Sequence, residues 1–191
     1  MPTTLSDQPR KLSPERRARI LDAARYLILR QGLRATTMEA IAREARIAKP
    51  TLYGYFADKD AVFAAIVREI GTDIHAAVEG ALAGEGDVAA RIAAALNAKY
   101  RVINKVLQGS PHAGELYDEH GREGMEAFSG LDGWVEAAIS KALSEAGVAR
   151  PRPLAQLVLA AAFGVGRKAQ NPAEIGPALR VLVERLVRPE L

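Results

Sequence analysis

Hydrophobic residues recur along this chain every three or four positions, the period of a helix with one buried face. The first such stretch begins at Ser13, a good N-cap residue, with Pro14 at the first helical position. Gly32 is expected to end it. A second run covers residues 36–46, and a third helix is expected to begin at Lys49. Because no strand-like alternation or internal repeat occurs, the sequence predicts an all-α protein with about nine helices.

Longer apolar stripes continue through the rest of the chain. They predict helices over residues 58–83, 87–107, 121–146, 154–170 and 173–187, and a short helix over 111–120. Residues 150–153, Arg-Pro-Arg-Pro, are interpreted as a stiff connector. The stretch 154–170 is apolar around most of its circumference, which predicts burial on most sides.

The two short helices over 36–56 have features suited to a DNA groove. Thr36 and Glu39 have the spacing of a capping box. Leu52 and Phe56 are spaced to face inward together, so residues 49, 51, 53 and 55 are expected to face largely outward. These are lysine, threonine and two tyrosines, whose polar ends can reach phosphates and base edges.

Charge is spread unevenly over the 191 residues, whose net charge is +3. Residues 1–60 contain 12 Lys and Arg against 7 Asp and Glu, whereas the remainder contains 14 against 16. A basic first third fits either a surface that faces nucleic acid or a solvated helix face. The absence of cysteine excludes disulfides and thiolate metal sites. Because neither a membrane-length apolar run nor a signal-peptide core is present, we expect a cytoplasmic protein.

At these residues the chain resembles the TetR family of bacterial transcription regulators. The matching pattern is Thr36-Thr37, Ile41-Ala42, Ala45, Ile47, Thr51-Leu52-Tyr53, Tyr55-Phe56, Lys59 and Val62-Phe63. The chain departs from the family pattern at Arg46, where glycine is usual, and at Ala48, where serine is usual. Arginine in a tight turn is strained if its φ is positive, and alanine cannot cap a helix as serine does.

The resemblance implies three parts: a flexible arm over residues 1–12, a helix-turn-helix domain over 13–57, and a helical effector-binding and dimerisation domain over 58–191. It also implies that Lys59 contacts a phosphate, while Arg46 adds a further candidate contact. We therefore expect double-stranded DNA to contact Thr37, Arg46, Lys49, Pro50, Thr51, Tyr53, Tyr55 and Lys59.

In the family, the body binds a small effector and dimerises through its last two helices. The expected dimer interface comprises Leu157, Ala161, Gly164, Leu179, Leu182, Val183 and Leu186. Scattered aromatic residues can line an effector pocket, although any single one of them is better explained as an ordinary core or interface residue. They are Tyr100, Tyr117, Phe128, Trp134 and Phe163.

The resulting hypothesis is a homodimeric repressor that a small molecule releases from a palindromic operator, without cofactor or catalysis. One alternative is a DNA-binding regulator with no ligand. Another is a helical metal-binding enzyme, since His112 and His120 bracket Glu115, Asp118 and Glu119. Their spacing matches no strong metal motif, and no nucleophile elbow or phosphate-binding loop occurs.

Overall fold

The computed structural model describes residues 13–107, 110, 112, 122–169 and 171–191. These residues form eight α-helices and no strand, which confirms the all-α prediction. The helices are α1 (Pro14–Ala35), α2 (Met38–Glu44), α3 (Lys49–Tyr53), α4 (Lys59–Leu82), α5 (Val88–Leu107), α7 (Arg122–Glu145), α8 (Pro151–Lys168) and α9 (Pro172–Leu186), followed by a 3-10 turn η1 (Arg188–Glu190). The expected arm and the expected helix over 111–120 lie outside the described residues.

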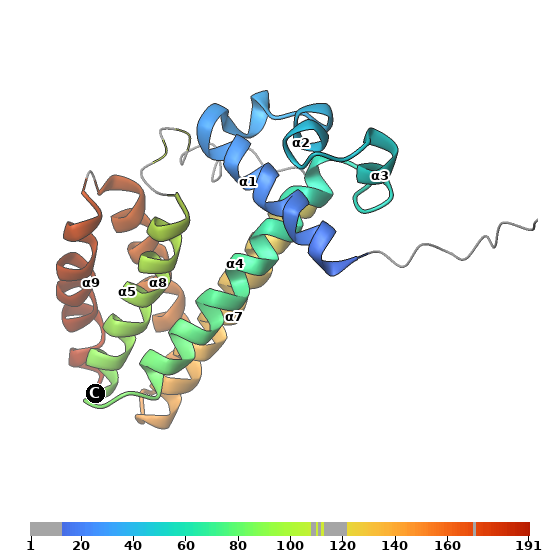
Figure 1. Ribbon diagram of the computed structural model, residues 1–191. Coiled ribbons are helices and arrows are strands. Elements are labelled where there is room, and N and C mark those ends of the chain that lie inside the picture. Colours follow the sequence, from blue (N-terminus) through green and yellow to red (C-terminus); the bar gives the residue numbers. More distant parts are fainter. Residues whose placement is uncertain (1–12, 108–109, 111, 113–121, 170) are drawn as a thin grey trace, which may run out of the picture.

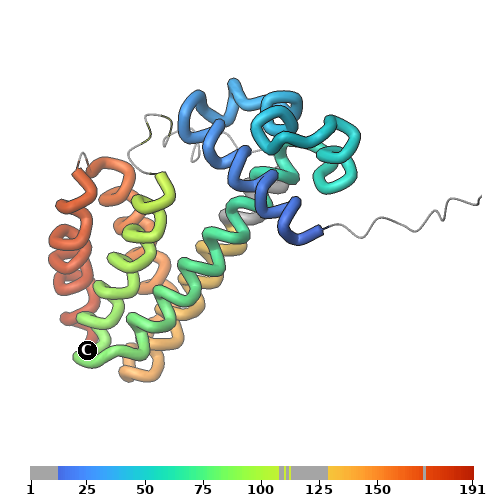
Figure 2. The backbone as a smooth tube through the Cα atoms, in the orientation of Figure 1, coloured from blue at the N-terminus to red at the C-terminus, as the bar shows by residue number. Residues whose placement is uncertain are grey.

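The helices form a small head and a larger body, joined by α4. Helices α1, α2 and α3 gather at one end of the molecule, and α4 runs from them along the length of the body (Figure 1). In the body, α4 packs against α5 and α7, α9 packs against α5 and α8, and α8 packs against α7. Helices α4, α5, α7, α8 and α9 therefore surround a common interior. Figure 2 traces the backbone from one helix to the next.

Helix α4 contributes to two separate hydrophobic cores. Its first turns, with Val62, Phe63 and Ile66, belong to the core of the head. Its later residues Ile74 and Val78 belong to the core of the body. A displacement of α4 in the body therefore moves the head with it, because its first turns cannot leave the head without exposing buried apolar surface.

Most helix starts follow the chemistry expected from the sequence. The Ser13 hydroxyl accepts a hydrogen bond from the Arg16 amide (3.4 Å), and the Asp58 carboxylate accepts one from the Ala61 amide (2.8 Å). The capping assignment to Thr36 was wrong by one residue. Thr37 caps α2, and Thr36 instead donates from its buried hydroxyl to the Gly32 carbonyl (2.8 Å).

The predicted connector over residues 150–153 was also wrong. Pro151 is the first residue of α8, so the helix starts before Leu154. Proline lacks the backbone N–H, but the first turn of a helix has no acceptor for that group anyway. The two prolines therefore begin α8 instead of separating it from α7.

Within one chain, α8 is buried on one side only. Ala155, Val158 and Ala162 face the body core, whereas Leu157 and Phe163 are 52% and 45% exposed. The sequence predicted burial of this helix on most sides, and one chain covers only one of them. Burial of the other side of α8 would require a second surface packed against it.

Candidate DNA-binding surface

The head anchors α3 through one face and exposes the other. Leu52 is fully buried in the head core, and Phe56, just beyond the helix, is nearly so. On the other face, Lys49, Pro50 and Tyr53 are exposed, and Thr51 is half-buried. The predicted orientation is thus confirmed for Lys49 and Tyr53, whereas Tyr55, also expected to face outward, is half-buried against the head core.

The turn between α2 and α3 is a Schellman motif with arginine in the glycine position. The Ile47 amide donates to the Ala42 carbonyl (3.0 Å), and the Arg46 amide donates to the Arg43 carbonyl (3.1 Å). This pattern places Arg46 at φ 54°, the one positive φ of a non-glycine residue among the described residues. The same motif ends α7 with Gly147 at φ 86°, where no side chain resists the conformation.

We expect Arg46→Gly to stabilise the protein. Removing the left-handed strain is worth about 1 kcal/mol in the free energy of unfolding, equivalent to roughly 2–4 °C in melting temperature. Thermal denaturation measures the change. Arg46→Ala is the matched control, because it removes the same charge but retains a Cβ. If the two variants melt at the same temperature, the turn does not hold strain.

Lys49, at the start of α3, has an acidic partner within the head. Its ammonium contacts the Glu39 carboxylate of α2 and lies 5.9 Å from the centre of the Tyr53 ring. The hydrogen bond with Glu39 raises the pKa of Lys49 and lowers the pKa of Glu39. Lys49 therefore remains charged, and contact with a phosphate requires it to exchange or share this carboxylate.

Three further candidates have partners that the sequence did not predict. The Tyr55 hydroxyl, half-buried against the head core, accepts the Ser13 amide (2.8 Å) and so joins the start of α1 to the end of α3. The Lys59 ammonium donates to the Leu33 carbonyl (2.7 Å) and more weakly to that of Arg34 (3.4 Å). The Thr37 hydroxyl accepts the Ala40 amide (3.1 Å) at the exposed start of α2.

Lys59 thus closes the C-terminal end of α1, where unpaired carbonyls favour a cation. An ammonium has three donors, so at least one remains for another acceptor. Sequence reasoning missed this partner because residues 33 and 59 are distant in the chain and no local pattern joins them.

The head is also fixed to α4 by a shared carboxylate. Glu69 of α4 accepts from Arg17 (3.0 Å) and Arg25 (3.2 Å), both on α1. Arg17 also lies over the Phe56 ring, 5.6 Å from its centre. Because these side chains are partly shielded from solvent, the pairs orient α1 on α4 more than exposed pairs would.

The aromatic residues proposed for an effector pocket occupy different environments. Tyr100 is buried and donates from its hydroxyl to the Ala162 carbonyl of α8 (2.9 Å). Trp134 of α7 packs against His75 of α4 with ring centres 4.0 Å apart, so this pair of rings lies between the two helices. Phe163 faces outward instead of into the body, which corrects its assignment as a pocket residue. Tyr117 and the side chain of Phe128 lie outside the described residues.

Described residues line at least three pockets. One of 630 Å³ lies among α4, α5 and α9, and one of 540 Å³ lies between α7 and α8. The third, of 420 Å³, lies where α1, α4 and α5 meet. All three have volumes within the usual range of small-molecule sites.

The expected dimer interface needs correction on α9. Leu179 and Val183 have no exposed surface and belong to the body core, so they cannot also contact a second chain. Leu182 and Leu186 are partly buried beside them, and Val181 is 61% exposed. On α8, Leu157 and Gly164 are exposed and Ala161 is half-buried. An interface on these helices would therefore use Val181 in place of the two buried residues.

The metal-site alternative rests mainly on residues outside the described ones, since only His112 of that group is described. Elsewhere in the described part of the chain, no group of three or more potential ligands gathers.

No helix in the described part of the chain is both long enough and apolar enough to span a bilayer.

Among known proteins, the sequence of the head has the clearest relatives. Residues 20–66 match the bacterial regulatory proteins of the tetR family. Over 50 residues the chain is 48% identical to the HTH-type transcriptional regulator HbdR of Aromatoleum sp. (strain CIB), a match covering 26% of this chain and 22% of that protein. Over 88 residues it is 34% identical to the HTH-type transcriptional regulator BetI of Paraburkholderia phymatum, covering 46% of this chain and 45% of that one. The chain thus spans less than half the length of each curated relative.

The whole fold has counterparts among solved structures. A transcriptional regulator of the TetR/AcrR family from Thermobifida fusca superposes with a TM-score of 0.71 at 23% identity, covering 88% of this chain and 96% of that one. A surface helix held across a tight turn, on an all-helical body, defines the class of helix-turn-helix DNA-binding regulators. Within that class, the head matches the tetR family, and the fold of the whole chain is that of a TetR/AcrR-family regulator. Its relatives regulate transcription and are not enzymes.

Proposed function

We propose that the chain is a homodimeric repressor that occupies a palindromic operator in the cytoplasm and leaves it when the body binds a small molecule. The observation that carries the proposal is the exposed face of α3, with Lys49, Pro50 and Tyr53 at the surface beside the half-buried Thr51. Lysine and tyrosine reach phosphates, while the short threonine side chain can meet a base edge or a thymine methyl.

Two features support the proposed dimer: one recognition helix contacts few base pairs, and the body exposes large apolar side chains. A single recognition helix reads few base pairs, and dimers read two half-sites about one helical turn or a multiple of it apart. Leu157, Phe163 and Val181 leave large apolar side chains exposed on α8 and α9. A second copy related by a two-fold axis would cover them and supply the second head.

Selection of bound sequences from a random pool of double-stranded DNA tests the proposal. The expected result is an inverted repeat, because a two-fold protein binds a two-fold site. Thr51→Ala should change the preferred base at one position in each half-site more than it changes the overall affinity. Recovery of no sequence, or of sites without symmetry, would count against a dimeric operator-binding protein.

Lys59→Ala should weaken binding to every DNA sequence and also reduce stability. Removing one neutralised phosphate from the interface lowers the slope of log affinity against log salt by about 0.9. The Leu33 and Arg34 carbonyls of α1 also lose the hydrogen bonds from the ammonium, so the melting temperature should fall. The measurements are salt titrations of DNA binding and thermal denaturation.

The matched control is Lys141→Ala, which removes the same charge from α7 in the body. It should leave the slope unchanged. A lower affinity for Lys59→Ala with an unchanged slope would mean that Lys59 acts only by holding the end of α1.

A further inference from the structure

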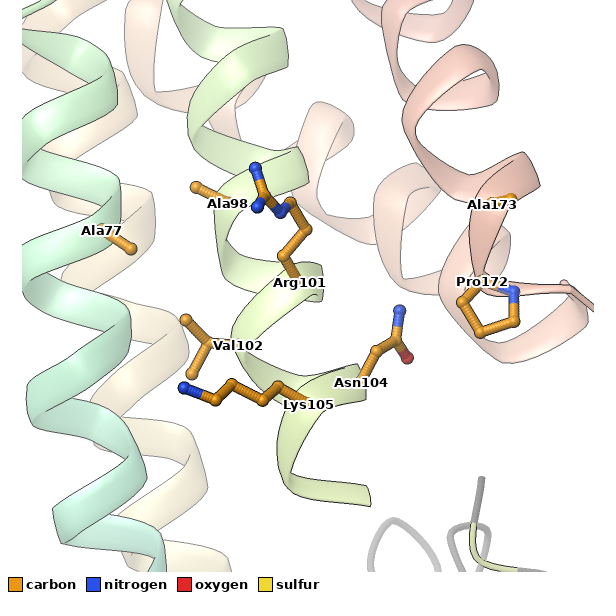
Figure 3. A pocket seen from close by; sticks show the side chains of 8 residues that line it. All are labelled: Ala77, Ala98, Arg101, Val102, Asn104, Lys105, Pro172 and Ala173. Carbon is orange, nitrogen blue, oxygen red and sulfur yellow. The ribbon is translucent and has the colours of Figure 1, made fainter. Parts of the chain in front are cut away.

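The largest of the three pockets crosses the outer side of α5. It extends from Ala77 on α4 to Pro172 and Ala173 at the start of α9 (Figure 3). None of these residues belongs to the candidate DNA-binding surface. They also differ from the exposed apolar residues of α8 and α9 proposed for the dimer interface. The pocket is therefore a separate feature of the body.

Two cations line this pocket without a counter-charge. Arg101 and Lys105 lie one helical turn apart on α5, and neither forms an ion pair with any described residue. Like charges at this spacing destabilise a helix. An anion bound between them would remove that repulsion.

The other two pockets differ in this respect. In the pocket between α7 and α8, Arg152 pairs with the lining residue Glu136 (3.3 Å). In the pocket beside the head, Arg25 pairs with the lining residue Glu69 (3.2 Å). The α5 pocket has two cations and no acid among its lining residues, so its charge is not neutralised by its own walls.

The rest of the lining suits an apolar group. Ala77, Ala98 and Val102 present carbon atoms beside the cations, and the α9 end adds a proline ring. Lys105 extends toward α4, whereas Asn104 points toward the start of α9 (Figure 3). A ligand with one anionic head and an apolar tail would therefore find a guanidinium, an ammonium and an apolar surface within one pocket.

We propose that this pocket binds an organic monocarboxylate with an apolar tail, and that this ligand is the effector of the regulator; the second part rests on the proposed function. The planar guanidinium of Arg101 can bind a carboxylate through two parallel hydrogen bonds, and Lys105 adds a second positive charge. Asn104 provides an amide for a further polar group of the ligand.

The position of the pocket connects it to the head. Its walls belong to α4, α5 and α9, and the first turns of α4 lie in the head core. A ligand that binds one separation of α4 and α5 more tightly than another shifts the molecule toward that arrangement. The heads of a dimer would then move relative to each other, by an amount limited by the ligand's difference in affinity.

Direct binding of decanoate, measured by titration calorimetry on the full chain, tests the site. Decan-1-ol and decylamine are controls with the same tail but a neutral or positive head. We expect decanoate to bind in preference to both. Arg101→Gln and Lys105→Gln should each weaken it about tenfold, and the double variant about a hundredfold, since one charge-assisted contact is worth about a factor of ten.

Lys141→Gln is the matched control, because it removes one positive charge from another pocket of the body. It should bind decanoate as the wild type does. Both Arg101 and Lys105 are exposed, so their replacement should not unfold the chain. Undiminished binding by the double variant, or equal binding of the alcohol, overturns the proposed site.

Release of DNA is measured separately, with an operator obtained by selection. Decanoate should release the wild type at concentrations that leave the double variant bound. Binding of decanoate without any release overturns its role as effector. Failure of the chain to select any DNA instead overturns the proposed function, while binding through Arg101 and Lys105 can still be measured.

Discussion

Gly164→Glu should convert the proposed dimer into folded monomers that no longer hold its operator. A Cβ at Gly164 meets nothing within 4 Å in the single chain, so the substitution fits the monomer. In the proposed dimer the same position would bury an unpaired carboxylate in each copy, at several kcal/mol apiece. Loss of the second head also removes the gain from simultaneous binding, about 10²–10⁴ in affinity. Mass in solution and operator affinity measure the two effects.

The matched control is Gly80→Glu on α4, another exposed helical glycine whose Cβ meets nothing within 4 Å. It should remain dimeric and bind DNA. A wild type that is monomeric at micromolar concentration would contradict the prediction, as would a Gly164→Glu protein that stays dimeric.

Gly166→Ala should destabilise the protein although alanine is the better helix former. A Cβ at Gly166 would lie 2.2 Å from a ring atom of Tyr100. The ring is buried and its hydroxyl is fixed on the Ala162 carbonyl, so it cannot move without breaking that bond. Overpacking and the broken hydrogen bond cost about 2–4 kcal/mol, against about 1 kcal/mol gained in helix propensity. Denaturant titration should show a net loss of about 2 kcal/mol in unfolding free energy.

Two further variants identify the cause. Gly80→Ala introduces the same methyl group where it meets nothing, and it should stabilise the chain by up to about 1 kcal/mol. Gly166→Ala combined with Tyr100→Leu removes the clashing ring atoms and should recover part of the loss. If the double variant is no more stable than the sum of the two single changes predicts, the clash is not the reason.

Local patterns predicted the helices and the inward face of α3, because apolar period and capping groups act within a few residues. The adjacent threonines show the limit of that approach. Thr36 and Thr37 can both cap a helix, and the spacing to Glu39 favoured the former. In the structure Glu39 contacts Lys49 instead, and Thr36 turns its hydroxyl to the end of α1.

Partners from distant parts of the chain could not be predicted. The carbonyl that receives Lys59 and the amide that binds Tyr55 meet them only after the head has folded. On α9, periodicity identified the apolar residues but not which of them its own body would cover. Leu179 and Val183 face inward and Val181 outward, and that choice depends on the packing of α5 and α8 around the helix.

Because α4 is long, a small tilt of its body end produces a large displacement of the head. Its 24 residues correspond to about 36 Å of helix at about 1.5 Å per residue. A tilt of about 5° at the body end would carry the far end through roughly 3 Å, and two such arms in a dimer would change the separation of the heads by up to about 6 Å. Half-sites one helical turn apart are separated by about 34 Å, so this change is a large fraction of a base-pair step on each side. In the proposed dimer, an effector that moved α4 by less than about 1 Å near its pivot in the body would therefore put both heads out of register with their grooves.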